Sequence, residues 1–326
     1  MAVKDLLIMM AAAASTEGWQ PVYDLAGEGR VAVWDSGNSR AYIGGDNGIR
    51  YTTNQGDTFF TPSVGVTTAD FGAMVGGYLM ASGHQTKAVY TTFSGNTYAE
   101  LLYTNPNAIM ERAIGGVDNG LVYFLGNPRG AMARVNPANN TVTDITATIQ
   151  SVIGSSTADC NGAYLPQQGV TVIGGNDGRY VISTDDNLTF SLLDMSIPTV
   201  TGPMSAVVET SAARCIAVVN ERVYFSDNVT NPSSWTEGQD LSGIPGNFWG
   251  EGNIIASSTD SDITLISGRA SGAEAIVVST DNGSTWALDT SSFAVPVNEF
   301  ISQMCYAGNN TFFAITNANK LYVRAF

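Results

Sequence analysis

Carboxylates are the commonest side chains in this sequence that could take part in chemistry. The chain has 29 Asp and Glu residues, and glycoside hydrolysis requires two carboxylates held at a fixed separation. Asp35, Asp70 and Asp159 are candidates for such a pair, although no neighbouring residues distinguish them from the other acids. Most of the acids lie in predicted turns, where hydrogen bonds to backbone N–H groups account for them.

The single histidine, His84 in Ser-Gly-His-Gln, offers little further chemistry. One His cannot build a multi-histidine metal site, and no nucleophile elbow accompanies it for a Ser–His–acid triad. Segments 44–48 (GGDNG) and 174–178 (GGNDG) lack the Lys-Ser/Thr and the helix of a phosphate loop. They are predicted to be hairpin turns between the second and third strands of two repeats. A calcium ion on Asp46 or Asp177 is the less favoured alternative.

The cysteines also point away from a reactive site. Cys160, Cys215 and Cys305 show no CxxC spacing, so a zinc site is not expected. Their odd number leaves at least one free thiol, and we predict that all three are small buried hydrophobic residues. The sequence therefore predicts no catalytic residue, no cofactor and no metal.

A repeated turn dominates the rest of the chain. Residues 279–286 read STDNGSTW, and degraded copies occur at 52–59 (TTNQGDTF), 91–98 (TTFSGNTY) and 183–190 (STDDNLTF). A stretched copy lies at 226–235 (SDNVTNPSSW). Each copy follows a short β-type run and precedes another strand-like stretch, which indicates a hairpin turn.

Each turn residue has a predicted structural role. The first Ser or Thr and the Asp bond backbone N–H groups, Gly supplies a positive φ, and the aromatic packs beneath the turn. Asn can replace either Asp or Gly, because it tolerates both roles. The residues assigned these roles are Ser279, Asp281, Gly283, Thr285 and Trp286, then Thr52, Asn54, Gly56, Thr58 and Phe59, then Ser183, Asp185, Asn187, Thr189 and Phe190.

The pattern Ser-x-Asp-x-Gly-x-Thr-Trp resembles the Asp-box (BNR repeat) of sialidase-type β-propellers. Residues 279–286 match it at all five fixed positions. The resemblance implies a propeller whose boxes lie on the rim, away from any active centre, so it bears on fold far more than on chemistry.

The catalytic pattern of the sialidases is not matched. Those enzymes use three Arg residues that converge on a carboxylate, with a Tyr–Glu pair and an acidic proton donor. No Arg-Ile-Pro segment precedes Thr52, and Arg30, Arg40 and Arg50 fall on successive predicted strands. The other Arg residues considered are scattered at strand starts: Arg112, Arg179, Arg222 and Arg269.

The repeat spacing predicts the architecture. The predicted third strands begin at Ile49, Ala88, Ala131, Arg179, Arg222, Ala275 and Leu321, which are 39 to 53 residues apart. This period suits four-stranded propeller blades. We therefore predict an all-β, seven-bladed β-propeller of antiparallel blades. In the third repeat, residues 135–140 (VNPANN) are expected to turn the chain in place of a box.

The ends of the chain are predicted to meet. Residues 321–326 form a third strand, and residues 15–22 (STEGWQPV) look like the end of a box followed by its strand. Segment 19–25 is therefore expected to pair beside 321–326 and close the ring, which removes open sheet edges. Residues 15–326 would form a single propeller domain.

Residues 1–14 are expected to form a short apolar N-terminal arm. The run 6–14 (LLIMMAAAA) is too short to span a bilayer. It could be the apolar part of a secretory signal, but Asp5 beside Lys4 weakens that interpretation. We favour an arm that docks on a neighbouring subunit or under the propeller, with interface candidates Leu6, Leu7, Ile8, Met9 and Met10.

The charge excludes two classes of partner. The net charge is −15, and the only lysines are Lys4, Lys87 and Lys320. Such a surface argues against binding nucleic acid through phosphates and against docking to an anionic membrane. We expect no nucleic-acid partner and no membrane span.

Three functions remain. The favoured one is a non-enzymatic structural protein of a bacteriophage virion, in the tail or at the head–tail junction, because the chain resembles propeller proteins of such particles in its Asn-, Thr- and Gly-rich turns. Its partners would be other virion proteins and copies of itself, with a host-surface glycan as a further candidate. The alternative is a secreted glycan-binding or glycan-cleaving (sialidase-like) propeller, with Trp34, Trp235 and Trp249 as stacking candidates. The third is a periplasmic or lumenal assembly factor similar to the propeller that helps photosystem II assemble, but the basic patch of that family is not visible here.

Overall fold

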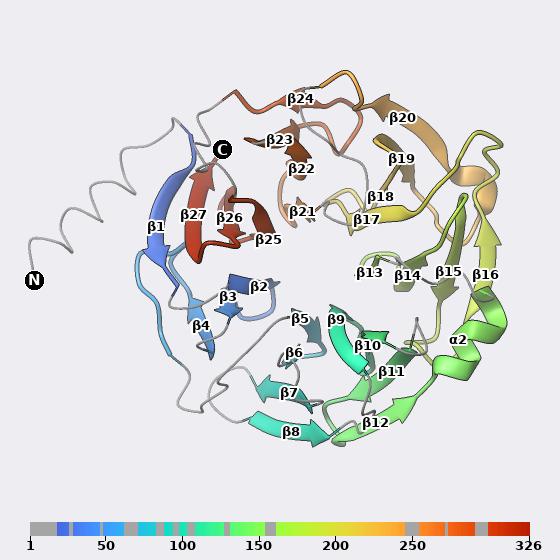
Figure 1. The fold of residues 1–326 in the computed structure, drawn as a ribbon, viewed down its shortest axis with the longest axis horizontal. Helices are drawn as coiled ribbons and strands as arrows, with labels where there is room; N and C mark the ends of the chain where they lie inside the picture. Colours follow the sequence, from blue (N-terminus) through green and yellow to red (C-terminus); the bar gives the residue numbers. More distant parts are fainter. Residues whose placement is uncertain are drawn as a thin grey trace, which may run out of the picture.

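The structure is a computed structural model that describes residues 18–25, 29–45, 48–61, 71–82, 88–93, 98–102, 108–126, 131–153, 161–244, 254–270, 273–290 and 299–326. Within these ranges, six four-stranded sheets and one three-stranded sheet stand in a ring (Figure 1). All strand pairs within the sheets are antiparallel: the fold is an all-β propeller with little helix.

The sheets are numbered here in chain order. Sheet 1 is β2 (Gly29–Asp35), β3 (Arg40–Gly45) and β4 (Gly48–Thr52); sheet 2 is β5 (Phe71–Val75), β6 (Tyr78–Ser82), β7 (Ala88–Phe93) and β8 (Tyr98–Leu102). Sheet 3 is β9 (Ala108–Ile114), β10 (Gly120–Gly126), β11 (Ala131–Asn136) and β12 (Thr141–Asp144); sheet 4 is β13 (Gly162–Leu165), β14 (Val170–Gly174), β15 (Arg179–Ser183) and β16 (Ser191–Asp194). Sheet 5 is β17 (Met204–Glu209), β18 (Cys215–Val219), β19 (Arg222–Ser226) and β20 (Thr236–Asp240); sheet 6 is β21 (Ile254–Ser257), β22 (Thr264–Ala270), β23 (Ala273–Ser279) and β24 (Ala287–Leu288). Sheet 7 is β25 (Ile301–Tyr306), β26 (Thr311–Thr316), β27 (Lys320–Ala325) and β1 (Gln20–Asp24).

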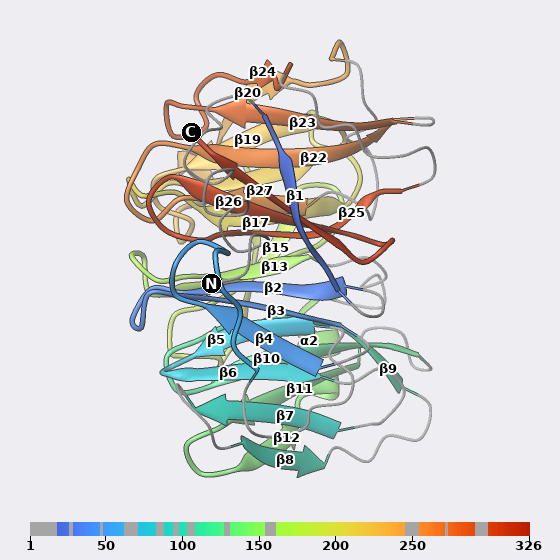
Figure 2. The same cartoon turned by 90° about the vertical axis from the view of Figure 1, so that its left-hand side faces the viewer.

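The first strand of each sheet lines the centre of the ring. Contacts run in order from β2 to β5, β9, β13, β17, β21 and β25, and the contact between β25 and β2 completes the circle. Figure 1 shows these strands around the centre, with β8, β12, β16, β20 and β24 at the periphery. Seen from the side, the sheets stand as successive layers (Figure 2).

The second strands explain why the sequence runs are apolar at consecutive positions. All five residues of β18 are buried. Cys215, Ala217 and Val219 pack toward sheet 4, whereas Ile216 and Val218 pack toward sheet 6. Because successive side chains of a strand point to opposite faces, a strand covered on both faces needs apolar residues throughout.

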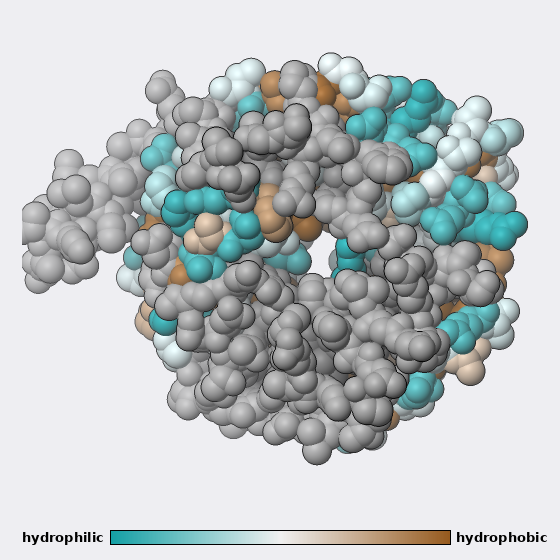
Figure 3. Space-filling model, in the orientation of Figure 1, coloured by the Kyte–Doolittle hydropathy of each residue, from teal (hydrophilic) through white to brown (hydrophobic). Residues whose placement is uncertain are grey.

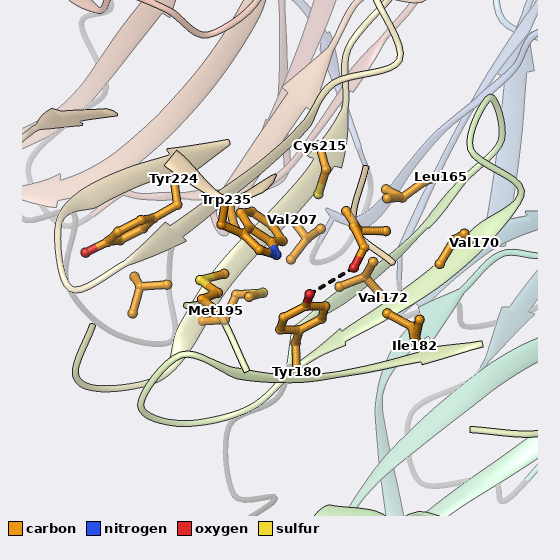
Figure 4. Close-up of a cluster of buried hydrophobic side chains, with 14 of the residues drawn as sticks. Leu165, Val170, Val172, Tyr180, Ile182, Met195, Val207, Cys215, Tyr224 and Trp235 are labelled. Atoms are coloured by element: carbon orange, nitrogen blue, oxygen red, sulfur yellow. Dashed lines mark hydrogen bonds between the residues drawn. The ribbon is translucent and has the colours of Figure 1, made fainter. Parts of the chain in front are cut away.

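The core is divided among the junctions between sheets. Figure 4 shows the junction of sheets 4 and 5, where Tyr180 and Trp235 meet edge-on with ring centroids 5.5 Å apart. The Tyr180 hydroxyl donates a hydrogen bond of 2.9 Å to the Val229 carbonyl, so this buried phenol is satisfied. Similar apolar clusters lie at the other junctions.

The predicted closure is confirmed. β1 pairs antiparallel with β27, with Gln20 opposite Val323 and Asp24 opposite Lys320. Trp19 is 3% exposed, and its indole N–H donates a bond of 3.2 Å to Asp289 Oδ2. The same carboxylate oxygen forms an ion pair with Arg324 Nη1. One buried carboxylate of sheet 6 therefore holds both chain segments that close sheet 7.

The prediction of seven four-stranded blades needs a correction: the four-stranded blades number six, because sheet 1 has three strands in the described part of the chain. After the turn that follows β4, Phe60 forms a single antiparallel bridge with Tyr51. The two residues exchange backbone bonds of 3.0 and 2.8 Å, and their rings stack with centroids 5.4 Å apart. A one-residue bridge thus occupies the place of the fourth strand.

In the described part of the chain, two short helices interrupt the sheets. α2 (Thr146–Ile153) follows β12 and packs beside β11, β15 and β16, so the sequence pattern missed a helix at the edge of the ring. The 3-10 helix η1 (Pro232–Ser234) lies within the stretched turn, and the Asn231 side chain caps it through the Ser233 N–H at 3.1 Å. Residues 1–14, including Leu6 to Met10, lie outside the described residues, so the arm stays a prediction.

The closing carboxylate gives the first testable expectation. In Asp289→Ala, the Arg324 guanidinium, whose side chain is 15% exposed, loses its buried partner, so the free energy of unfolding should fall by about 3 kcal/mol. The control is Asp227→Ala, because that carboxylate is 72% exposed beside Arg214 and should contribute less than about 1 kcal/mol. Urea unfolding of both variants measures the difference; equal midpoints would contradict a closing role.

The buried phenol of Tyr180 predicts how the stability of the protein depends on pH. Burial raises the pKa of Tyr180 to about 12, whereas an unfolded tyrosine ionises near pH 10. Between these values the folded protein keeps a proton that the unfolded chain has lost, so stability must fall as pH rises, by up to about 1.4 kcal/mol per pH unit.

Tyr180→Phe should cost about 1 kcal/mol at neutral pH, from the lost bond to Val229, and should decline less steeply above pH 10. Urea midpoints of the two proteins from pH 8 to 11 test this expectation. Parallel declines would show that Tyr180 does not carry the alkaline sensitivity.

Candidate functional site

The turns at 52–59, 183–190 and 279–286, called the repeat turns below, join the third strand of a sheet to the segment that follows. In the turn after β23, Ser279 Oγ accepts bonds from the N–H groups of Gly283 at 2.8 Å and Asp281 at 3.3 Å, and donates to Asp281 Oδ1 at 2.8 Å. Thr52 and Ser183 make the matching bonds in their own turns. One hydroxyl thus orders each turn.

In the two repeat turns that have an Asp at the third position, this acid binds the threonine four residues later. Asp281 accepts the Thr285 N–H at 2.8 Å and the Thr285 hydroxyl at 2.7 Å, and Asp185 binds Thr189 in the same way at 2.9 and 2.6 Å. Partial desolvation opposes ionisation, but these hydrogen bonds outweigh it and lower the pKa of both carboxyls. Both therefore act as ionised structural acceptors.

Asn54 performs the same task with one bond reversed. Its Oδ1 accepts the Thr58 N–H at 3.1 Å, and its Nδ2 donates to Thr58 Oγ1 at 2.9 Å. A threonine hydroxyl can donate or accept, so Asn fits where Asp stands in the other turns. Asn therefore replaces Asp in this turn, as predicted, and both hydrogen bonds to the threonine are kept.

The fourth residue of each repeat turn has a role that the sequence pattern did not reveal. Asp186 and Asn282 have φ values of 57° and 55°, and the residues that follow them, Asn187 and Gly283, have 65° and 80°. Gln55 and Gly56 repeat this pair at 52° and 97°. Two successive left-handed residues form a tight bend at a position that the motif leaves unspecified.

At the bend, Asp186 bridges to the preceding sheet. Its carboxylate accepts the N–H groups of Val117 at 2.8 Å and of Asp118 and Asn119 at 2.9 Å, and the Asn119 side chain adds a further bond at 2.9 Å. The acceptor is thus shared by three consecutive N–H groups in the hairpin between β9 and β10. It joins sheet 4 to sheet 3.

At two other junctions, the fourth residue of the turn also bonds the first hairpin of the preceding sheet, but through different chemical groups. Asn282 Oδ1 accepts a bond of 3.2 Å from the Ser211 hydroxyl, in the first hairpin of sheet 5. In the stretched turn, the Val229 N–H donates 3.0 Å to Gln168 Oε1, in the first hairpin of sheet 4. Glu209 adds a second link there by accepting the N–H groups of Gln167 and Gln168 at 2.8 and 3.0 Å. The turn of one sheet therefore fastens the first hairpin of the sheet before it.

The aromatic residue completes the turn from below. Trp286 is 5% exposed, and its indole N–H donates 3.0 Å to the Gly283 carbonyl. Its backbone N–H and carbonyl are held by the Gln239 side chain of β20 at 2.8 and 3.0 Å. Phe59 and Phe190 are partly buried against the cores of their own junctions.

The catalytic candidates do not assemble into a site within the described residues. Asp35 is 4% exposed and accepts two bonds from Asn38 in the hairpin after β2. Asp177, in the predicted turn between β14 and β15, accepts the Gly202 N–H of sheet 5 at 2.9 Å. Asp46, Asp70, His84, Asp159 and Cys160 lie outside the described residues.

The described thiols are buried as predicted. Cys215 and Cys305 are free and pack within junction cores. Burial raises the pKa of both thiols far above the ordinary range. They are therefore protonated at neutral pH and behave as small apolar side chains.

The described arginines are spread over several sheets, and those in sheet 1 lie on neighbouring strands, Arg40 on β3 and Arg50 on β4. Arg40 lies over the Tyr51 ring, 5.1 Å from its centroid, in sheet 1. Arg222 pairs with Glu237 and Asp240 on the outside of sheet 5. The side chains of Arg30 and Arg269 are not among those described.

Two of the three tryptophans considered for sugar stacking are packed inside. Trp235 is 5% exposed, and Trp34 is partly buried and meets Tyr306 edge-on with ring centroids 5.6 Å apart. Trp249 lies outside the described residues. A glycan platform on Trp235 is therefore wrong, because its ring belongs to the junction core.

The described residues hold no group of three or more His, Cys, Asp or Glu side chains arranged for a metal ion. No described helix has the length and apolar character needed to cross a membrane.

The turn geometry predicts a graded response at Asp281. Asp281→Ala removes both acceptors of Thr285 and should lower the free energy of unfolding by about 1–2 kcal/mol. Asp281→Asn should cost less, because Asn54 shows how an amide fits. The lowered pKa means that the carboxylate stabilises the fold above the unfolded pKa and loses this effect as pH falls through the folded pKa. The control is Asp57→Ala, an exposed acid of another repeat turn; urea midpoints that rank otherwise would refute the assignment.

Comparison with known proteins agrees on the fold and no more. No protein-family model matches the chain, and no curated protein does. Among solved structures, YCF48 bound to D1 peptide aligns with a TM-score of 0.63 at 16% identity, covering 96% of this chain and 98% of the other. Virginiamycin B lyase from Staphylococcus aureus aligns at 0.62 and 11% identity, covering 94% and 98%. The Cps50 (Swd1) β-propeller domain of Myceliophteria thermophila aligns at 0.67 and 9% identity, with the same coverage. The chain is similar to these proteins as a β-propeller.

Proposed function

We propose that this chain is a non-enzymatic structural protein that acts through protein–protein contacts. The observation that carries the proposal is the number of hydrogen bonds that the carboxylates of the repeat turns already accept. Asp185, Asp186 and Asp281 each accept at least three hydrogen bonds from neighbouring turn or hairpin groups. Acids held in this way support the fold, and little of their bonding capacity is left for a substrate.

The closed ring supports the same function. Sheets of the ring bury apolar faces against both neighbours, and β1 with Asp289 closes the last gap. A frame of this kind holds its rim in one arrangement, so that binding a partner costs little conformational entropy. Such a frame suits a component of a large assembly.

Within this proposal, the repeat turns belong to the Asp-box class and the assembly is a bacteriophage virion, at the tail or the head–tail junction. The hydrogen bonds that recur at Ser279, Ser183 and Thr52 support the first assignment. The strongly acidic, lysine-poor composition and the polar turns motivate the second. Other virion proteins and copies of this chain are the proposed partners, and the particle is the proposed location.

Structures with the same fold show that a propeller frame alone does not determine what a protein does. YCF48 is described as bound to D1 peptide, and virginiamycin B lyase carries an enzyme's name. Fold and activity are separable in propellers. We favour the peptide-binding comparison for this chain, because Trp235 is buried and unavailable for sugar stacking, and because Arg40 and Arg222 are engaged with Tyr51 and Glu237 of their own sheets.

Particle association tests the proposal. Particles produced with the native gene cluster are purified on a density gradient, and the chain is detected with an antibody raised against residues 161–244. We expect it in the particle band at a fixed copy number. A chain found only in the free fraction, with intact particles lacking it, would overturn the virion assignment.

Deletion of residues 1–14 tests the apolar arm. The truncated chain should fold, because β1 and its partners lie beyond the deletion, but it should be absent from particles. Circular dichroism and the thermal midpoint check the fold, and the gradient measures incorporation. Normal incorporation would remove the arm from the proposal while leaving the virion assignment in place.

A further inference from the structure

Two exposed apolar side chains lie at one junction of the ring. Val117 is 51% exposed and Leu188 is 53% exposed. Val117 lies in the hairpin between β9 and β10 of sheet 3, and Leu188 lies in the repeat turn of sheet 4. The Val117 N–H binds Asp186, two residues before Leu188, so the two side chains extend from backbone that is joined across the junction. They are called the rim pair below.

The backbone that carries the rim pair is firmly held. Asp186 accepts the N–H groups of residues 117 to 119, and Asn187 Nδ2 donates 2.5 Å to the Asn119 carbonyl. Arg134 Nη1 donates 3.2 Å to the Asn187 carbonyl from the other side. The exposure of the pair is therefore a feature of a fixed surface, where burying two apolar side chains costs little ordering.

The surroundings of the rim pair are acidic. Asp118 is exposed beside Val117, and Asp185 and Asp186 precede Leu188. The one described cation that bonds this turn, Arg134, is directed at a carbonyl of the turn. The carboxylates also affect a neighbouring phenol. The pKa of Tyr164 is raised mainly by burial, and further by the negative charges of Asp186 and Glu209. The local field is negative, as is the net charge of the chain.

We propose that the rim pair and Asp118 form a docking surface for a segment of another protein in which apolar side chains alternate with Lys or Arg. The apolar residues would cover Val117 and Leu188, and the cations would face the carboxylates. A second copy of this chain fits poorly, because it has a net charge of −15 and would oppose like charges. The inference rests on the proposed function and names the surface and the partner chemistry.

Peptide binding tests the surface directly. The probe is a fluorescein-labelled nonapeptide of alternating Lys and Leu, and the comparison peptides replace Lys by Glu or Leu by Ser. We expect binding of the Lys–Leu peptide by anisotropy, with the Glu–Leu and Lys–Ser peptides at least about tenfold weaker, since tenfold is the effect of one modest contact. Equal binding of the Lys–Ser peptide would reduce the effect to general charge attraction and overturn the proposal.

Variants locate the binding site. Val117→Ser with Leu188→Ser should weaken Lys–Leu binding by about tenfold or more, because apolar contacts at the centre of an interface dominate affinity. Asp118→Asn should weaken it less and reduce its salt dependence. The matched control is Leu192→Ser on β16, which is 40% exposed outside the junction bonds and should bind like the parent chain. All these side chains are exposed, so thermal midpoints should not change.

Four outcomes would overturn the docking surface: no binding of the Lys–Leu peptide, equal weakening by Leu192→Ser, no effect of the paired variant, or self-association that the paired variant abolishes. The last would identify a second copy as the occupant. Failure here is distinguishable from failure of the proposed function. If particles contain the chain but peptide binding does not depend on the rim pair, the surface is wrong and the virion role stands. If particles lack the chain but peptide binding depends on the rim pair, the surface stands and the virion role is wrong.

Discussion

Ring closure is the constraint on which the rest of this structure depends. The second strands of the sheets carry apolar side chains on both faces, as β18 shows by sending Cys215 toward one neighbour and Ile216 toward the other. A sheet of this kind is stable only between two others, so a ring left open would expose the apolar faces at its ends. The pairing of β1 with β27, held by Asp289, Arg324 and Trp19, prevents this. Asp289 and Arg324 are buried at this closure, and each neutralises the charge of the other. Their ion pair therefore stabilises the place where the two ends of the chain come together.

Local bonding explains which parts of the fold could be predicted from the sequence. In each repeat turn, the hydroxyl, the acid and the threonine bond within eight consecutive residues, so the pattern of residues 279–286 contains everything needed to form the turn. The strands on either side follow, and the pairing of segment 19–25 beside β27 followed from the strand count. The bonds of Asp186 and Asn282 could not be predicted, because their partners lie 67 to 71 residues away. The motif places no requirement on that fourth position.

Sheet 1 shows where a turn pattern stops being informative. Thr52, Asn54 and Thr58 form the expected bonds, yet the residues that follow make one bridge, at Phe60, in the described part of the chain. A turn can be complete without the strand that it introduces, since its hydrogen bonds do not depend on strand length. The sequence pattern therefore located the turn of sheet 1 correctly but overestimated the number of four-stranded blades, which is six in the described part of the chain and not seven. The helix α2 was missed for a related reason: its eight residues pack on the outer edge, where no repeat pattern applies.

The rim carries two kinds of side chain: those that stabilise the folded ring and those that do not. Asp186 is needed, because three N–H groups of the neighbouring sheet would lose their acceptor without it. Val117 contributes to that bond with its backbone alone, and Leu188 stands on a turn already ordered by Ser183 and Asp185. Each of these two residues is more than half exposed, so the frame would form equally well with polar residues there. Apolar groups that folding does not require, fixed on backbone that folding makes rigid, are what a surface selected for a partner must provide.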